Sequence, residues 1–169
     1  LKKSLDAKVE ASRSVKGVRE AVAAQEVPAE GFFAASRIFV VDEPTFFASP
    51  ELRHEHFGPV SIVVRCDATA MNEAAAKFDG QLTATIHADE GDMAWARQLL
   101  PALVEKAGRM VWNGYPTGVA VVPAIHHGGP YPASTNSLHT SVGTTAIRRF
   151  LRPVVFQNLP ESLLPEDLR

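Results

Sequence analysis

Cysteine is nearly absent from this sequence, since Cys66 is the only one in 169 residues. A single cysteine excludes an intrachain disulfide, which suits a reducing compartment. The chain also lacks the run of roughly 20 apolar residues that a membrane span needs, and its first residues lack the apolar core of a signal peptide. We therefore expect a cytoplasmic protein without a membrane partner.

A basic excess is missing as well. The chain has 17 Lys and Arg against 19 Asp and Glu, a formal net charge of -2, and 8% aromatic residues. Nucleic-acid binding leaves a footprint of clustered Lys and Arg among aromatics, so we expect no nucleic-acid partner. A hydrophobic content of 46% is enough for the core of one globular domain.

Motifs for a metal site or a hydrolase are lacking too. Six histidines are present without a HExxH motif or Cys-rich spacing, and the adjacent His126 and His127 would point apart in a strand. Ser134 or Ser141 near His139 has the residue types of a hydrolase, yet the Gly-x-Ser-x-Gly elbow is absent. We expect neither a bound metal nor this hydrolase chemistry.

Cys66 remains as a rival nucleophile. It follows an apolar run and precedes a predicted helix, where a thiolate is favoured, but the Asp67 carboxylate opposes that charge and no histidine is adjacent. We interpret Cys66 as a structural cysteine.

The N-terminal third reads as helix, turn and strand. Apolar residues at helical spacing predict one or two amphipathic helices over residues 1 to about 25, broken near Gly17. A turn over 27–31 leads into the β-rich run 37–42, which predicts a strand. Residues 45–50 predict a short turn that holds two phenylalanines.

An alternation of strands and helices follows and predicts an α/β fold. Because the connections are short, the pattern indicates a three-layer α/β arrangement with a mainly parallel sheet. Ligands bind beyond the carboxyl ends of parallel strands, and Asn113 occupies such an end. The predicted elements are strands at 61–66, 82–87 and 110–113, a helix at 68–78 capped by Asp67, and a helix at 89–108 kinked at Pro101.

Residues 114–139 form an unusually long stretch rich in Gly, Pro, Ser and His. A loop of this size in a compact domain is more often functional than accidental, so we interpret it as an active-site wall. His126 and His127 are either hydrogen-bonding loop residues or substrate contacts. A short helix at 143–150 and a strand at 152–157 close the chain, and this strand is free to pair with another subunit's sheet.

The stretch 54–60 leads through Gly58 and Pro59 into a buried strand. Glycine takes backbone angles that other residues resist and proline fixes φ, so Glu55 and Phe57 are held in fixed directions. A glutamate and an aromatic two positions apart suit a ligand with hydroxyls on one side and a flat ring on the other. A purely structural turn is the alternative interpretation.

Residues 55–60, Glu-His-Phe-Gly-Pro-Val, resemble the Glu-x-Phe-Gly-Pro-Val signature in the C-terminal part of the aldehyde dehydrogenase superfamily. Residues 80–85 are similar to the family's Gly-Leu-x-Ala segment and 108–114 to its Gly-x-Val-x-Val-Asn strand, in the same order and spacing. A narrower branch contains the α-ketoglutaric semialdehyde (2,5-dioxopentanoate) dehydrogenases and the NADP-preferring fatty aldehyde dehydrogenases. The segments that resemble this branch are 126–134, 140–143 and 149–154.

The resemblance implies the C-terminal part of a catalytic domain over 1–150 and an oligomerisation strand and tail over 151–169. It implies that an aldehyde is oxidised to a carboxylate through a thioester, with NAD or NADP, in a homo-oligomer. By the same resemblance, Glu55 falls on the glutamate that binds the nicotinamide ribose and Phe57 on the aromatic near the nicotinamide. The residues that fall on the wall of the substrate pocket are Asn113, Tyr115, His126 and His127.

The resemblance also implies what this chain does not hold. The nucleophilic cysteine, the general base and the nucleotide-binding fold would lie upstream of Leu1, so we expect an inactive fragment of a larger enzyme. The mixed lining of 115–134 suits both a small oxo-acid semialdehyde and a longer aliphatic aldehyde, and the resemblance favours α-ketoglutaric semialdehyde. A free-standing α/β binding or assembly module without catalysis is the alternative.

Overall fold

The computed structural model describes residues 1–22, 26–28 and 30–169. Residues 23–25, at the end of the predicted helical stretch, and Ala29, in the predicted turn, lie outside the described residues. The chain divides into two compact units, Leu1–Phe78 and Asp79–Arg169, which we call unit 1 and unit 2. No helix in the described part of the chain is long and apolar enough to cross a membrane.

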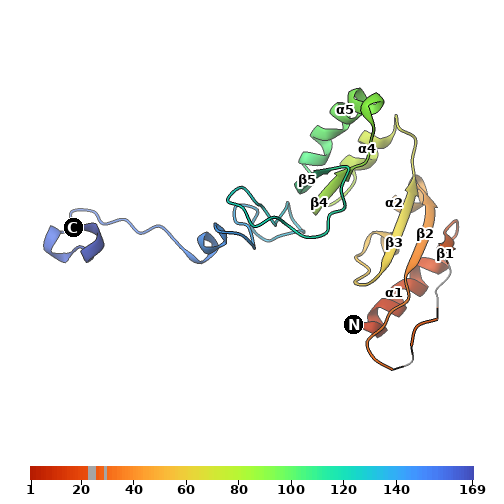
Figure 1. The fold of residues 1–169 in the computed structure, drawn as a ribbon, viewed down its shortest axis with the longest axis horizontal. Coiled ribbons are helices and arrows are strands. Elements are labelled where there is room, and N and C mark those ends of the chain that lie inside the picture. The colour runs from red at the N-terminus through yellow and green to blue at the C-terminus, as the bar shows by residue number, and fades with distance from the viewer. Residues whose placement is uncertain (23–25, 29) are drawn as a thin grey trace. The chain divides into compact units, whose positions relative to one another are not determined.

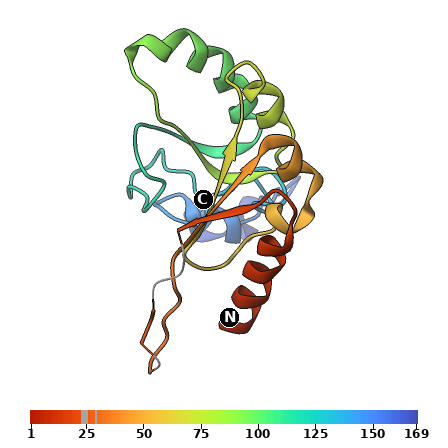
Figure 2. The ribbon, with the colours of Figure 1, turned by 90° about the vertical axis from the view of Figure 1, so that its right-hand side faces the viewer.

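Unit 1 is built on a three-stranded sheet (Figures 1 and 2). Its elements are α1 (Lys2–Ser14), β1 (Arg19–Val22), β2 (Arg37–Asp42), α2 (Glu43–Ala48), α3 (Pro50–Arg53), β3 (Val60–Arg65) and α4 (Met71–Ala76). The strand order is β1-β2-β3, with β1 antiparallel to β2 and β3 parallel to β2. The strands predicted at 37–42 and 61–66 are confirmed to within one residue.

The core of unit 1 lies between α1 and the sheet. Helical spacing places Leu5 and Val9 on one face of α1, and both pack against Phe39 of β2, which is 0% exposed. Val60 and Ile62 of β3 pack against the same cluster. A second cluster, formed by Val41, Phe46 and Leu52, joins the sheet to α2 and α3.

Residues 19–22 form a strand, so the predicted helical structure beyond Gly17 is wrong there. Gly17 has a φ of 94°, in the left-handed region that favours glycine, and turns the chain back toward β2. Glu20 of β1 then forms salt bridges with Arg13 at 2.9 Å and Arg37 at 2.7 Å. The hydrogen bond from Arg37, aided by Arg13, holds the pKa of Glu20 below its usual range.

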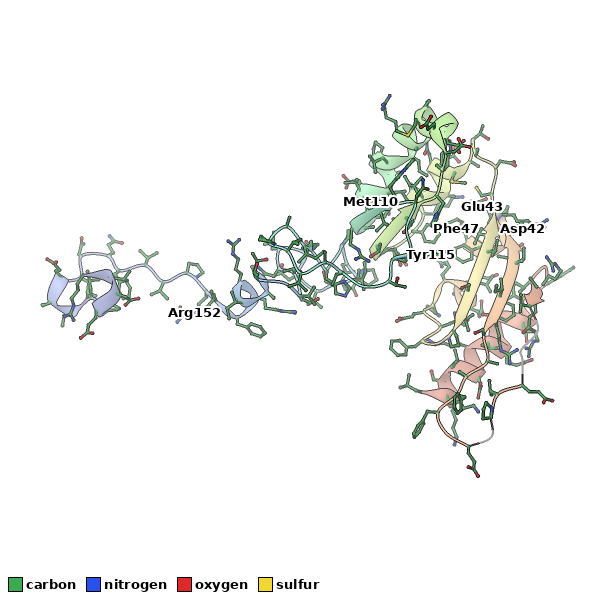
Figure 3. The ribbon with its side chains drawn as sticks, in the orientation of Figure 1. Asp42, Glu43, Phe47, Met110, Tyr115 and Arg152 are labelled. Carbon is green, nitrogen blue, oxygen red and sulfur yellow. The ribbon has the colours of Figure 1, made fainter. Side chains whose placement is uncertain are left out.

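The predicted turn at 45–50 is also wrong, because residues 43–48 form α2. Asp42 caps this helix by accepting a hydrogen bond from the Thr45 N–H at 2.9 Å, and a proline in the first turn is tolerated. Phe46 and Phe47 are held as predicted, with ring centroids 5.7 Å and 5.3 Å from that of Phe78. Figure 3 shows Asp42 where β2 passes into α2.

Unit 2 is built on a second, two-stranded sheet. Its elements are β4 (Gln81–Ile86), η1 (Glu90–Asp92), α5 (Met93–Val104), β5 (Ala107–Trp112), η2 (Ala146–Phe150), η3 (Glu161–Leu163) and η4 (Glu166–Leu168). β4 and β5 are parallel and are connected through α5, which buries Ala96 and Leu99. Parallel strand pairs joined through helices in both units confirm the α/β class.

The strands predicted at 61–66, 82–87 and 110–113 are present as β3, β4 and β5. Within unit 1, β3 pairs with β2, and within unit 2, β4 pairs with β5. The helix predicted at 68–78 is shorter than expected, because α4 begins after Ala70 rather than after Asp67.

The C-terminal segment carries no strand. The short helix predicted at 143–150 is present as the 3-10 helix η2 over 146–150, whereas residues 152–157 pair with no strand of the described chain. Val155 is 85% exposed in this segment, in which Figure 3 labels Arg152. A strand needs a neighbour for its backbone hydrogen bonds, so this apolar segment is left open to solvent.

Candidate functional site

The turn at 54–59 is attached to α1. The hydroxyl of Ser12, whose side chain is 0% exposed, is hydrogen-bonded to His56 Nε2 at 2.7 Å. A Cβ on Gly58 would lie 2.5 Å from a methyl carbon of Leu5, so glycine lets the turn approach the helix closely. His56 and Gly58 are therefore held against the helix.

Glu55 and Phe57 alternate with these anchored residues and face solvent. Phe57 is 67% exposed, and Glu55 is exposed as well. The Lys8 ammonium donates to the Glu55 backbone carbonyl at 2.5 Å, and the Glu55 carboxylate has no hydrogen bond or ion pair with any described residue. A free carboxylate can accept two vicinal hydroxyls and an aromatic face can restrain a flat ring, and the role of this pair at a nicotinamide riboside stays a prediction.

Ser12 is a supporting residue that the sequence interpretation missed. It continues the buried stripe of α1, since Leu5, Val9 and Ser12 follow one another at helical spacing. A polar residue at a core position of an amphipathic helix was the available signal, because a buried hydroxyl needs a hydrogen-bond partner.

Asn113 joins the carboxyl ends of β4 and β5. Its side-chain amide accepts a hydrogen bond from the Ala88 N–H and donates one to the Ala88 carbonyl, both at 2.8 Å. Its φ of 48° lies in the left-handed region, which asparagine tolerates better than most residues. The amide therefore positions the start of the long loop, and its contact with a substrate stays a prediction.

Tyr115 lies just after β5 and is 82% exposed, with its ring centroid 5.7 Å from that of His87 (Figure 3). The loop then turns back along β5. Arg109 of this strand donates to the carbonyls of Pro116 at 3.0 Å and Gly118 at 2.6 Å. Tyr115 is thus exposed, whereas the loop residues just after it are held to β5 by Arg109.

His126 and His127 are half-buried in a part of the loop that is held by hydroxyl groups. The Thr140 hydroxyl accepts from the His127 N–H and donates to the Val142 carbonyl, both at 2.9 Å. The Ser141 hydroxyl donates to the His127 carbonyl at 2.8 Å. These bonds fix the backbone of His127 and leave its imidazole beside a cavity.

Residues 128–131 cross the beginnings of β4 and β5 with backbone against backbone. A Cβ on either Gly80 or Gly108 would lie 2.0 Å from a carbonyl oxygen of this crossing segment. Asn113 marks the opposite edge of the sheet, so the loop runs from the carboxyl ends of the strands back to their amino ends. Only the first part of the predicted active-site wall lies at the carboxyl ends.

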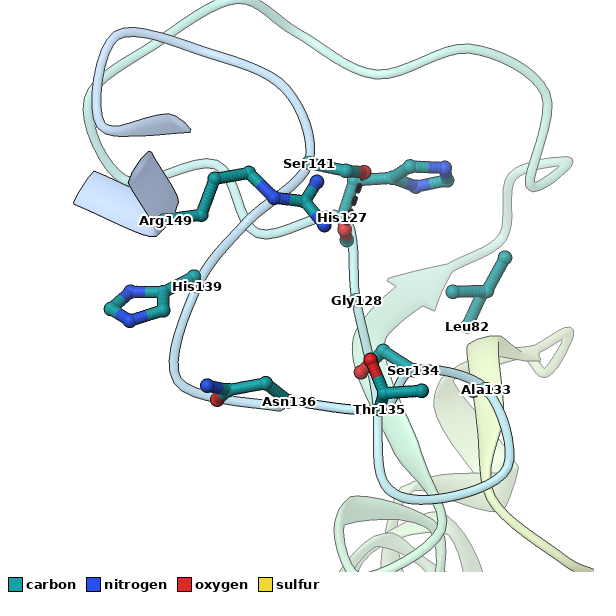
Figure 4. Close-up of a pocket in the computed structure, with 10 residues that line it drawn as sticks. All are labelled: Leu82, His127, Gly128, Ala133, Ser134, Thr135, Asn136, His139, Ser141 and Arg149. Carbon is teal, nitrogen blue, oxygen red and sulfur yellow. Dashed lines mark hydrogen bonds between the residues drawn. The ribbon is translucent and has the colours of Figure 1, made fainter. Parts of the chain in front are cut away.

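A cavity of about 430 Å³ opens beside the crossing segment (Figure 4). Its titratable lining residues are His127, His139 and Arg149, with no Asp or Glu among the residues that line it. Hydroxyl and amide groups of Ser134, Thr135 and Asn136 complete the polar part of the lining. The site is suited to an anion.

Cys66 lies in surroundings that disfavour a thiolate. Burial, followed by the Glu43 and Asp67 carboxylates, raises the pKa of the thiol. A raised pKa lowers the reactivity of a cysteine at neutral pH, which supports a structural role. Among the residues that the structure describes, no group of three His, Cys, Asp or Glu side chains is arranged to hold a metal ion.

Two curated proteins are similar to most of this chain. Alpha-ketoglutaric semialdehyde dehydrogenase 2 of Azospirillum brasilense is 49% identical over 154 residues, which are 90% of this chain and 29% of that protein. Alpha-ketoglutaric semialdehyde dehydrogenase of Acinetobacter baylyi is 51% identical over 139 residues, which are 80% of this chain and 26% of that protein. The chain therefore spans less than a third of the length of these relatives.

No protein family model matches the chain. Among solved structures, the Delta-pyrroline-5-carboxylate dehydrogenase of Mycobacterium tuberculosis bound with NAD is similar with a TM-score of 0.66 and 20% identity. The similarity covers 96% of this chain and 30% of that chain. At this level of identity, the likeness shows a shared fold.

Proposed function

We propose that this chain is part of an NAD(P)-dependent dehydrogenase that oxidises α-ketoglutaric semialdehyde to a carboxylate. The chain belongs to the aldehyde dehydrogenase superfamily and has the α/β fold of a C-terminal portion of such an enzyme. The identity of 49% and 51% to two dehydrogenases named for this substrate carries the proposal. The same identity favours this substrate over a longer aliphatic aldehyde.

Glu55 and Phe57 are the residues that we assign to the cofactor. NAD or NADP, when bound, would accept the hydride that leaves the aldehyde carbon. The exposed Glu55 carboxylate would accept hydrogen bonds from the ribose hydroxyls next to the nicotinamide, and Phe57 would restrain the ring. The bond between Ser12 and His56 supports this role, because it fixes the turn that presents both side chains.

The substrate side is assigned to Asn113, Tyr115, His126 and His127. The fixed backbone of His127 and the exposure of Tyr115 support this assignment. We assign the nucleophilic cysteine, the general base and the nucleotide-binding fold to parts of the enzyme outside this chain. The chain alone would then contribute contacts to the cofactor and the substrate without completing the reaction.

In the full-length enzyme, Glu55→Gln is expected to slow hydride transfer roughly 10- to 100-fold, because a hydrogen bond to a charged group is worth roughly 1.5–3 kcal/mol. Affinity for the adenine end of the cofactor should change little, since Glu55 is assigned to the other ribose. Single-turnover nicotinamide absorbance with α-ketoglutaric semialdehyde measures the rate.

Glu51→Gln is the matched control, because Glu51 is an exposed glutamate of α3 only four positions away. It should leave the single-turnover rate unchanged. An unchanged rate in Glu55→Gln would remove Glu55 from the cofactor site. A wild-type kcat/KM that is larger for hexanal than for the semialdehyde would overturn the proposed substrate instead.

We also propose that the enzyme is a homo-oligomer in which residues 152–157 add as a strand to a neighbouring subunit. Val155→Asp should raise the subunit dissociation constant at least tenfold, roughly 1.4 kcal/mol, because association would bury the new carboxylate. Sedimentation of the full-length enzyme measures this, with Leu163→Asp as a control at another exposed apolar residue. Equal dissociation constants for Val155→Asp and wild type would exclude the strand addition.

A further inference from the structure

The cavity of about 430 Å³ in unit 2 differs in the charge of its lining from a cavity of similar size in unit 1. A cavity of about 410 Å³ in unit 1 combines Arg65 with the acidic side chains of Asp42, Glu43 and Asp67. The unit 2 cavity has only basic titratable groups in its lining, although the chain as a whole has a formal net charge of -2. A basic lining in an acidic chain attracts anions locally.

Arg149 supplies the permanent positive charge of this cavity. Its guanidinium has no carboxylate partner among the described residues and lies 5.8 Å from the centroid of the Phe150 ring. In Figure 4, Arg149 extends from η2 toward the Ser141 and His127 part of the loop. A guanidinium presents parallel N–H donors that match the two oxygens of a carboxylate.

The loop that forms the cavity is fixed by its own hydroxyl groups. Ser134 accepts from the Gly129 N–H at 3.3 Å and donates to the Gly129 carbonyl at 2.6 Å. The Ser141 hydroxyl donates to the His127 carbonyl at 2.8 Å. Because these hydroxyls hold the loop, the lining is already arranged before a ligand arrives, and Arg149 is left to recognise it.

We infer that this cavity binds a small carboxylate through Arg149. Its volume of about 430 Å³ lies within the range of about 300–1,000 Å³ that is common for small-ligand sites. The inference rests on the proposed function in one respect, namely that the carboxylate is the one at the 2-oxo acid end of the semialdehyde, which would then lie on the His127 side of the assigned wall rather than beside Asn113. A free dicarboxylate from solution offers the same chemistry, and the experiment separates the two sources.

The experiment compares Arg149→Gln and Arg149→Lys with Arg148→Gln in the full-length protein. Arg148 is the neighbouring arginine of η2 and does not line the cavity. Its replacement therefore removes the same positive charge without changing the cavity lining. Calorimetric titration with glutarate measures binding of a dicarboxylate without an aldehyde. Steady-state kinetics then give kcat/KM for the semialdehyde and for hexanal, which has no carboxylate.

Arg149→Gln is expected to lower the affinity for the carboxylate roughly tenfold or more, because a hydrogen bond to a charged group is lost. If the substrate is the ligand, kcat/KM falls for the semialdehyde alone. If a free dicarboxylate is the ligand, glutarate affinity falls and kcat/KM is unchanged. The affinity or rate of Arg149→Lys should lie between those of wild type and Arg149→Gln in either case, because lysine keeps the positive charge and lacks the parallel N–H donors of the guanidinium.

Wild-type affinities and rates in Arg149→Gln, or equal losses in Arg148→Gln, would overturn the carboxylate site. The failure of the proposed function has a different signature. In that case the wild-type protein does not oxidise the semialdehyde, whereas the titration with glutarate still shows whether Arg149 binds a carboxylate.

Discussion

Replacing Gly108 by alanine is expected to lower the free energy of unfolding of unit 2 by about 3 kcal/mol, near the top of the usual range for overpacked sites. The new Cβ would lie 2.0 Å from the Gly128 carbonyl oxygen, and a backbone atom cannot rotate away as a flexible side chain does. Either β5 or the crossing segment must shift, which disturbs His127 next to it. Urea unfolding followed by tryptophan fluorescence reports this unit, because Trp95 and Trp112 are the only tryptophans.

Gly91→Ala is the matched control in the same unit. The nearest atom to its new Cβ would be the Asp89 carboxylate oxygen at 3.1 Å, an atom of an exposed side chain that accepts from the Gly91 N–H and would have to move by only a few tenths of an ångström. We expect a change within about 0.5 kcal/mol, as at most surface positions. Equal unfolding midpoints for the two variants would show that the backbone crossing is not tight.

The strands that the sequence predicted best are those with a continuous β-branched or apolar run. β2, β3 and β4 each begin and end within one residue of their predicted bounds. β5 begins three residues before its predicted start at 110, because Gly108 reads as the end of a helix and lies inside the strand. A strand glycine with a close backbone neighbour looks like a turn residue when only the sequence is known.

Segments whose structure depends on a distant partner could not be predicted in this way. β1 has four residues and exists through its antiparallel pairing with β2, so its helix-like spacing was misleading. Residues 152–157 illustrate the opposite case, because their pattern favours a strand but no described strand pairs with them. Local propensity is a weak guide wherever tertiary pairing decides the structure.

In the candidate site, too, local features were predicted from the sequence and features that depend on distant contacts were not. The resemblance identified Glu55 and Phe57, but the reason they face solvent is the attachment of His56 to Ser12, which lies 44 residues earlier in the chain. No periodicity reports a contact at that separation. Arg149 was likewise not predicted as an anion contact, because the fold of the loop decides which of several C-terminal arginines lines the cavity.

Phe39→Ala is expected to lower the free energy of unfolding of unit 1 by about 3–5 kcal/mol, the range for removing a buried phenylalanine. Phe39 is 0% exposed and packs against Leu5 and Val9, so its loss leaves a cavity between β2 and α1. The turn that carries Glu55 is attached to the same helix and should become less fixed. In the full-length enzyme, the KM for the cofactor should therefore rise.

Segment-resolved hydrogen exchange measures the effect of Phe39→Ala, because both tryptophans lie in unit 2 and fluorescence does not report unit 1. Peptides from α1 and β2 should exchange faster than in wild type. Val63→Ala is the control, since Val63 is 47% exposed on β3 and its truncation should cost at most about 0.5 kcal/mol. If α1 peptides exchange at the same rate in both variants, Phe39 does not hold α1 on the sheet, and the support proposed for the Glu55 turn is lost.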